Sequence, residues 1–454
     1  MWTVAQLAAD LDKGSTTSRE LVEQALARIA DGAGEGKRAF LKVYIESARA
    51  EADYSDRLRK SGVRRSLVEG LPVSLKDLFD VAGDVTRAGS RILEKNSAAK
   101  TDASAVARLR AAGAVFIGRT NMVEFAFGGV GLNPHYGTPR NPYDRKTGRV
   151  PGGSSSGAAV AQADGMCVMA LGSDTRGSIR GPSALCGVVG FKPTMRRVPR
   201  DGAFPLSYTL DSVGPLANSV GCCAAYDAVL SGDSHAALSG DPEFLPDFPL
   251  KGARLLLPRS SAIEDLDAPV EKAFAESIGK LSKAGAVVSE LAVPAFDRQG
   301  EYFKGGGFAG AEAYYIHRRW LDRLGEYDPR VGKRVVLGKD ISGADYVALG
   351  FLREEFKRSV EALSAPFDAI LMPTVPCVAP TIEEANRSDE DYFRWNTRIL
   401  RNNGLVNFLD GCAVSLPCQE PGCAPVGLMV CGTAGTDRRL LAVSAAIERA
   451  LSRA

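Results

Sequence analysis

Short apolar segments of strand type alternate along this chain with segments of helical periodicity. The strand pattern is found in LPVSLKDLF (71–79), AVFIGRT (114–120), CVMALGSD (167–174), GVVGFKPT (187–194), ARLLLP (253–258), AVVSEL (286–291) and FDAILMPTVP (367–376). Helical spacing is found at 102–112, 158–163 and 269–283, over much of 300–363, and at 437–452. Strands and helices in alternation predict an α/β fold built of layers.

Residues 1–70 differ in pattern and are predicted to form an N-terminal helical region. Thr17 and Glu20 make a capping box, apolar residues follow at helix spacing, and a second helix is expected at 48–59. The chain has no internal repeat and no low-complexity linker, so we expect one domain over 1–454. Its parts are the helical region 1–70, a core at 71–230, a loop-like seam at 231–249, and a C-terminal part at 250–454 that completes the sheet and the pocket.

The charge balance narrows the range of partners. Lysine and arginine number 56 against 54 acidic residues, which leaves a formal net charge of +2. So small a charge gives no electrostatic footprint for nucleic acid or for an anionic membrane. Asp10 and Asp12 lie where a signal peptide needs an apolar run, and an odd number of cysteines, nine, favours reduced thiols. We therefore expect a cytoplasmic protein without a membrane or nucleic-acid partner.

Two turns rich in glycine and serine are candidates for chemistry. PGGSSSG (151–157) precedes a helix of small residues, but the chain has no GxxxxGK[ST] motif, which argues against a nucleotide site. LGSDTRGS (171–178) leads from a buried strand into a polar turn in which Ser178 follows Gly177. Backbone N–H groups converging there would form an oxyanion hole. The competing interpretation is an ordinary Ser/Gly turn after a strand.

Lys76 lies in an otherwise apolar strand pattern, and lysine is almost never buried without a partner. It is either a strand-end lysine that reaches solvent, paired with Asp77 or Asp80, or a desolvated base. Desolvation favours the neutral amine, which can accept a proton from a serine. Only three histidines occur and no GxSxG motif is present, so a lysine base is simpler than a Ser-His-Asp triad. The shortage of histidine and the absence of a CxxC pair also argue against a metal site.

Together these segments resemble the amidase signature family, which includes bacterial amidases and the A subunit of glutamyl-tRNA amidotransferase. The resemblance covers most of the chain and is densest between residues 71 and 215. It is carried by the order and spacing of LPVSLKDLFDVAG, TNMVEFAFG, RNPYD, PGGSSSG, GSDTRGSIRGPSALCGVVGFKPT and LDSVGP, and more weakly by FDAILMPTVP, NFLDGCAVSLP and VGLMVCG. It implies a large mixed β-sheet covered by helices on both sides.

The resemblance also implies the catalytic residues. The lysine of the family falls on Lys76, the serine that follows a cis peptide on Ser154, and the nucleophile on Ser178, 24 residues further on. Neutral Lys76 would take a proton from Ser154, which would take one from Ser178 as that serine attacks the amide carbon. The oxyanion hole would be formed by the backbone N–H groups of Thr175, Arg176, Gly177 and Ser178.

Some positions depart from the family pattern, and others have two possible roles. Ser156 replaces a glycine, with little expected effect. Arg176 stands where the family commonly has glycine; it either faces the pocket and attracts an anionic group or points to solvent or to Asp174. Arg180 is either a substrate contact or a packing partner. The candidate substrate contacts are Arg176, Arg180, Gly129 and Val130.

The expected function is that of an amidase that hydrolyses the C–N bond of a small amide without a cofactor. The alternative is the glutaminase (A) subunit of a tRNA-dependent amidotransferase complex, although the chain is short for that role and differs from it at Arg176. A non-catalytic binding protein would need a decayed motif, whereas Lys76, Ser154 and Ser178 are all present. In this kind of enzyme an N-terminal helical region often supports dimers, so a homodimer is a further expectation.

Overall fold

The computed structural model describes residues 3–233 and 245–453. It contains one eleven-stranded sheet with the order β1-β3-β2-β4-β6-β5-β10-β11-β9-β7-β8. The strands are β1 (Phe40–Val43), β2 (Pro72–Lys76), β3 (Val115–Thr120), β4 (Met169–Asp174), β5 (Val189–Lys192), β6 (Ser212–Ala217), β7 (Arg254–Arg259), β8 (Val287–Ala292), β9 (Ala369–Pro373), β10 (Cys412–Pro417) and β11 (Gly427–Gly432). β2 is parallel to β3 and β4, whereas β6 is antiparallel to β4 and β5, so the predicted mixed α/β sheet is confirmed.

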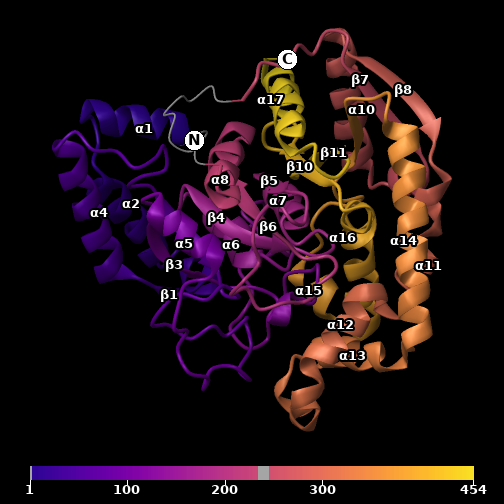
Figure 1. The fold of residues 1–454 in the computed structure, drawn as a ribbon, viewed down its shortest axis with the longest axis horizontal. Helices are drawn as coiled ribbons and strands as arrows, with labels where there is room; N and C mark the ends of the chain where they lie inside the picture. The colour runs from indigo at the N-terminus through magenta and orange to yellow at the C-terminus, as the bar shows by residue number, and fades with distance from the viewer. Residues whose placement is uncertain (1–2, 234–244, 454) are drawn as a thin grey trace.

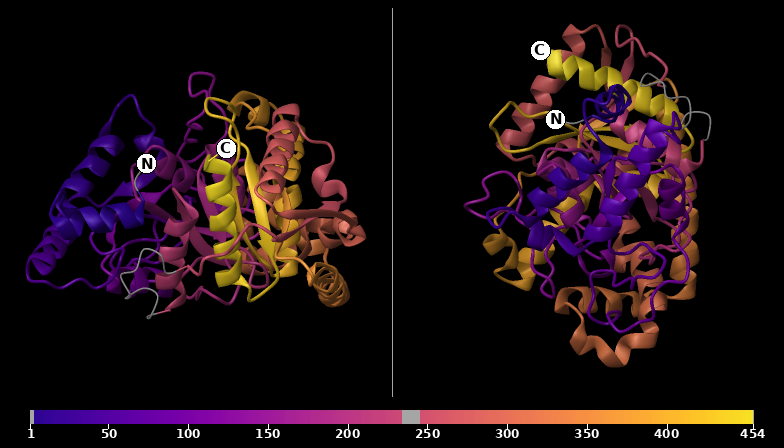
Figure 2. Two further views of the ribbon diagram at one scale, coloured as in Figure 1. Left: turned by 90° about the horizontal axis from the view of Figure 1, so that it is seen from above. Right: turned by 90° about the vertical axis from the view of Figure 1, so that its left-hand side faces the viewer.

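Helices cover both faces of this sheet. They are α1 (Val4–Lys13), α2 (Ser18–Ala30), α3 (Gly36–Ala39), α4 (Ile45–Lys60), α5 (Ser104–Ala111), α6 (Ser156–Ala163), α7 (Arg180–Cys186), α8 (Val220–Ser231), α10 (Ala268–Lys283), α11 (Gln299–Tyr302), α12 (Gly307–His317), α13 (Pro329–Leu337), α14 (Gly343–Ser364), α15 (Ile382–Asn386), α16 (Asp389–Leu409) and α17 (Asp437–Arg453). In Figures 1 and 2 the N-terminal helices α1, α2 and α4 lie at one end of the molecule, and α11 and α14 lie at the opposite end.

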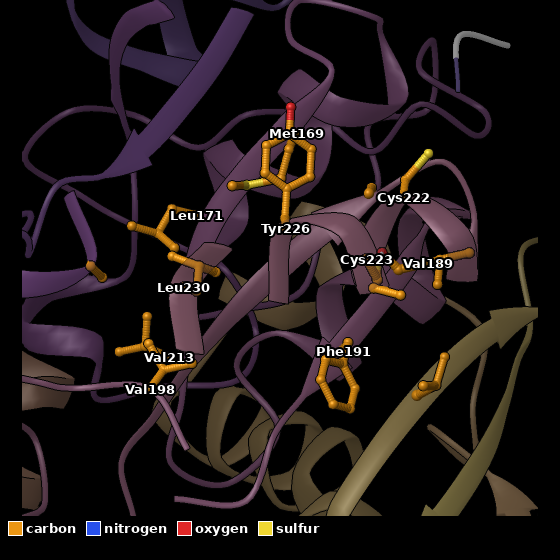
Figure 3. Packing of buried hydrophobic residues seen from close by; sticks show 14 of the residues in the cluster. Met169, Leu171, Val189, Phe191, Val198, Val213, Cys222, Cys223, Tyr226 and Leu230 are labelled. Atoms are coloured by element: carbon orange, nitrogen blue, oxygen red, sulfur yellow. Dashed lines mark hydrogen bonds between the residues drawn. The ribbon is translucent and has the colours of Figure 1, made fainter. Parts of the chain in front are cut away.

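The core follows from the alternation of side chains along the central strands. Successive residues of a strand point to opposite faces of the sheet. Met169 and Leu171 of β4 therefore join a cluster that includes residues of α8 and α17, while Ala170 joins a second cluster with α2, α4 and α6. Figure 3 shows the first cluster, in which Tyr226 and Leu230 of α8 pack near the strand residues. Small residues along α6 let this helix pack closely on the sheet.

Several elements differ from the prediction. The N-terminal helical region also contains β1, which forms the edge of the sheet and pairs with β3. The strand predicted at 71–79 ends at Lys76, and the next residues turn away, because the N–H of Phe79 donates to the carbonyl of Lys76. Much of the predicted seam at 231–249 lies outside the described residues. Among the helices that the structure describes, none is long and apolar enough to cross a membrane.

Candidate active site

Lys76 is the last residue of β2, which lies between β3 and β4 in the sheet, and its side chain is fully buried. Its Nζ lies 2.7 Å from Ser154 Oγ and 2.9 Å from Ser173 Oγ. Burial lowers the pKa of Lys76 to about 7, although the charges of Asp174 and Asp211 act in the opposite direction. The interpretation of Lys76 as a strand-end lysine that reaches solvent is therefore wrong, because the amine is buried and contacts two hydroxyl groups.

Ser154 follows a cis peptide bond from Gly153, the geometry that the resemblance implies. The residue is completely buried, and its carbonyl accepts a hydrogen bond from Val123 N at 3.0 Å. The loop that carries it ends at once in α6, which begins at Ser156. The hydroxyl of Ser156 is buried without a hydrogen-bond partner among the described residues. Ser154 is thus held with its hydroxyl on the amine of Lys76.

Ser178 lies in the turn between β4 and α7, and only 4% of it is exposed. The turn is tied to the Ser154 loop, because Ser155 N donates to the carbonyl of Ser178 at 3.2 Å. Gly177 has a φ of +119°, a backbone conformation that residues with a side chain rarely adopt. The three predicted catalytic residues thus come from β2, the loop before α6 and the turn before α7. The loop before α6 contacts both of the other segments and so joins them.

The backbone N–H groups of this turn are only partly free. Gly177 N donates to Asp174 Oδ1 at 2.7 Å, and Ile179 N donates to the other carboxylate oxygen at 3.1 Å. The N–H groups of Arg176 and Ser178 donate to no carboxylate oxygen of the described residues. Gly177 is one of the four residues predicted to form the oxyanion hole, but its N–H group donates to Asp174 and holds the turn in shape.

Arg180 is completely buried and forms an ion pair with Asp174, with 2.9 Å between Nη2 and Oδ1. The same Nη2 donates to the carbonyl of Asn403 at 3.1 Å and to Asn407 Oδ1 at 2.6 Å. Arg180 and the hydrogen bonds to its carboxyl lower the pKa of Asp174 well below its usual range, against the effect of burial. These contacts match the packing-partner alternative for Arg180 and give a substrate contact no support.

Replacing Arg180 by methionine is expected to lower the free energy of unfolding by about 3–5 kcal/mol, because Asp174 would remain buried without its counter-ion. Urea denaturation measures this change. Arg394→Met is the matched control, since Arg394 pairs with Asp391 at the surface, where an ion pair contributes about 1 kcal/mol or less. Equal stability of the two variants would contradict a structural role for Arg180.

A methyl group at Gly177 is expected to reduce kcat by about 100-fold, the effect of misplacing reacting groups by about 1 Å. A Cβ there would overlap the Cβ of Asn403, and the positive φ would be strained. Gly435→Ala is the control, because Gly435 also has a positive φ, of +81°, but nothing lies within 4 Å of a Cβ there. Steady-state kinetics measures the effect on kcat, and melting curves measure any loss of stability. A wild-type kcat in Gly177→Ala would contradict the placement of this turn at the reacting groups.

The Arg176 side chain lies against an aromatic ring. Its guanidinium carbon is 3.8 Å from the ring centre of Phe303, and its Nε has no hydrogen-bond partner among the described residues. Asp174, the carboxylate that was expected as one possible partner, is paired with Arg180 instead. The alternative in which Arg176 pairs with Asp174 is therefore wrong.

Gly129 and Val130, two predicted substrate contacts, lie in the loop that packs on Ser154. The carbonyl of Gly129 accepts a hydrogen bond from Gly153 N at 2.7 Å, and its N–H donates to Asn396 Oδ1 at 2.8 Å. A Cβ at Gly129 would lie 2.7 Å from Leu400, so the close approach requires glycine. The side chain of Val130 is fully buried in a core cluster and can face a substrate only through its backbone.

Two further residues, Ser173 and Asn403, lie at the site. Ser173 lies on β4 and contacts Lys76, and Asn403 of α16 packs on Gly177 while its Nδ2 donates to the carbonyl of Thr374 at 2.9 Å. A cavity of about 470 Å³ borders the site at Ser173 and Thr175. A serine at the end of a strand pattern was the only signal for Ser173 in the sequence.

Comparison with known proteins gives consistent matches. A family model described as Amidase matches residues 20–441. The chain is 34% identical over 405 residues to a 2-amino-5-chloromuconic acid deaminase of Comamonas testosteroni, covering 88% of this chain and 86% of the relative. It is 36% identical over 386 residues to AtzE, a 1-carboxybiuret hydrolase subunit of Pseudomonas sp. (strain ADP), covering 83% and 82%.

Further similarity extends over almost the whole chain. The A subunit of a glutamyl-tRNA(Gln) amidotransferase of Syntrophus aciditrophicus (strain SB) is 33% identical over 481 residues, covering 98% of this chain and 96% of that protein. Among solved structures, a crystal structure described as an amidase superimposes with a TM-score of 0.87 at 31% identity, and the match covers 99% of both chains.

Proposed function

Because this chain belongs to the amidase family, whose members are hydrolases acting on C–N bonds, we propose that it cleaves a small amide through an acyl-enzyme on Ser178. The observation that carries the proposal is the buried contact of 2.7 Å between Lys76 Nζ and Ser154 Oγ, next to the turn of Ser178. A lysine whose pKa is near 7 is neutral in a large fraction of molecules at neutral pH. It is therefore suited to act as a general base.

Acylation begins with a proton relay. Neutral Lys76 accepts the proton of Ser154 Oγ, and Ser154 Oγ accepts the proton of Ser178 Oγ as the latter bonds to the amide carbon. The carbonyl oxygen becomes an oxyanion, which the N–H groups of Arg176 and Ser178 stabilise. The C–N bond then breaks, the nitrogen takes a proton back along the same relay, and ammonia or an amine leaves.

Deacylation uses the same groups with water as the nucleophile. Lys76 and Ser154 take a proton from the water as its oxygen bonds to the acyl carbon. The ester bond to Ser178 breaks, and Ser178 Oγ recovers its proton through Ser154. The products are a carboxylic acid and ammonia or an amine, and the enzyme returns to its starting state.

The size of the substrate is proposed from two of the relatives. One is named for 2-amino-5-chloromuconic acid and one for carboxybiuret, and we propose that this chain likewise acts on a small molecule. The glutaminase role in an amidotransferase complex remains the competing function, because the A subunit of one such complex matches 98% of the chain.

A substrate screen read by ammonia release tests this function. The panel combines neutral aliphatic and aryl amides with malonamate, ureido amides, biuret-like compounds and glutamine. We expect the purified chain to release ammonia from at least one small amide other than glutamine. Release from glutamine alone, or from no compound, would contradict the proposal and favour a protein that needs partner chains.

A further inference from the structure

Arg176 places a positive charge two residues before the proposed nucleophile. Its guanidinium stacks on Phe303, and across from it a Cβ added at Gly404 of α16 would lie 3.3 Å from Nε. No carboxylate of the described residues forms an ion pair with it, and the nearby Asp174 is already neutralised by Arg180. Among the described residues, the charge of Arg176 therefore has no counter-ion.

Arg334 of α13 provides a second such charge. Its guanidinium carbon lies 4.1 Å from the ring centre of Phe127, and Nη1 donates to the Phe127 carbonyl at 2.8 Å. It too has no ion pair within the described ranges. A Cβ added at Gly128 would lie 3.9 Å from Nη1 of Arg334, and the carbonyl oxygen of Gly128 would lie 3.0 Å from a Cβ at Gly153. Arg334 therefore borders the loop that packs on the Gly153–Ser154 peptide.

The two guanidiniums are close enough to influence each other. Burial and the charge of Arg334 lower the pKa of Arg176 to about 9, and burial lowers that of Arg334. Arginine keeps its charge at neutral pH, so two partly buried cations lie near each other with no carboxylate partner among the described residues. Such an arrangement is costly unless an anion is bound, and its field attracts one.

We propose that Arg176 and Arg334 together bind a carboxylate carried by the amide substrate, so that the enzyme selects anionic amides over neutral ones. This inference rests on the proposed function, since it defines which amide Ser178 attacks. A planar guanidinium matches the two oxygens of a carboxylate. The Phe303 and Phe127 rings fix the planes of the two guanidiniums, which limits the rotamer entropy lost on binding.

Another role for these arginines is to cover the aromatic rings. In that case a neutral side chain of similar length would leave the preference for substrate charge unaltered. The quantity to measure is therefore the ratio of kcat/KM for an anionic amide to that for its neutral counterpart. Malonamate with malonamide and succinamate with succinamide are suitable pairs, because a carboxylate and a carboxamide differ little in shape.

We expect the wild type to favour the anionic member of at least one pair. In Arg176→Met and in Arg334→Met this ratio should fall by about 30-fold or more, the effect of truncating one member of a buried charge pair. The control is Arg319→Met, which removes an arginine stacked on Trp320 at the surface and should leave the ratio unchanged. A wild type without charge preference, or variants that keep it, would overturn the proposal.

A binding measurement separates this inference from the proposed chemistry. Isothermal titration of malonate and of malonamide into Ser178→Ala requires no turnover. We expect malonate to bind more tightly, and its Kd to rise by at least about 30-fold when Arg176→Met or Arg334→Met is added. If the enzyme hydrolyses nothing but binds malonate in this way, the function fails and the anion site stands. If malonate binds no better than malonamide, the anion site fails whatever the activity.

Discussion

Ser178→Ala is expected to lower kcat for any amide that the enzyme cleaves by at least about 10⁴-fold. Ser178 supplies the only oxygen that would bond to the acyl group in the proposed reaction, and alanine cannot replace it. The fold should survive, because a single hydroxyl is removed from a residue that is almost completely buried. Ammonia release and a melting curve, measured on the same preparation, report the two effects separately.

Ser282→Ala serves as the matched control for this prediction. Ser282 is an exposed residue of α10, so the same chemical change there should leave kcat at the wild-type level. A Ser178→Ala enzyme with more than about a tenth of the wild-type rate would show that another nucleophile performs the reaction.

Lys76→Met is expected to lower kcat/KM by about 10²–10⁴-fold, the usual contribution of a general base. It should also abolish the fall of kcat/KM below pH 7 that we expect in the wild type. Below its pKa of about 7, Lys76 carries a proton and cannot accept one from Ser154. In the wild type kcat/KM should therefore fall about tenfold for each pH unit below 7 and level off above it. Measurements between pH 5 and 9 test both parts.

Lys192→Met is the control for the loss of the pH dependence of kcat/KM below pH 7. Lys192 is also a fully buried lysine whose pKa is lowered by burial, but its Nζ donates to the carbonyls of Pro193 and Gly411. We expect its replacement to reduce stability while the rise in activity near pH 7 remains. If the rise persists in Lys76→Met, or disappears in Lys192→Met, Lys76 is not the base.

The three candidate catalytic residues could be named from the sequence because the motifs that carry the family resemblance are short and contain them. Lys76 interrupts an apolar strand, and Ser154 and Ser178 follow glycines in turns that precede helices. The alternation of strands and helices likewise indicated the α/β class. For β1, four residues at the edge of the sheet, the helical pattern around it concealed the strand, which forms through pairing with β3.

The surroundings of these residues could not be predicted, because they depend on contacts between distant parts of the chain. Phe303 and Arg334 have no local feature that distinguishes them, and they reach the site only through the packing of the helices between 299 and 337. Arg180 shows the same limit, since its sequence position suited a substrate contact and a packing partner equally well. Its pairing with Asp174 became evident only in three dimensions.

The most direct test of the proposed acyl-enzyme on Ser178 is the mass of the enzyme during turnover. An amide substrate found in the screen is mixed with the protein, the reaction is stopped with acid within milliseconds to seconds, and the intact mass and the peptides are measured. We expect an added mass equal to the acyl group, located on Ser178 and missing in Ser178→Ala. An acyl group on a different residue, or rapid turnover without any acylated protein even in a single-turnover burst, would contradict it.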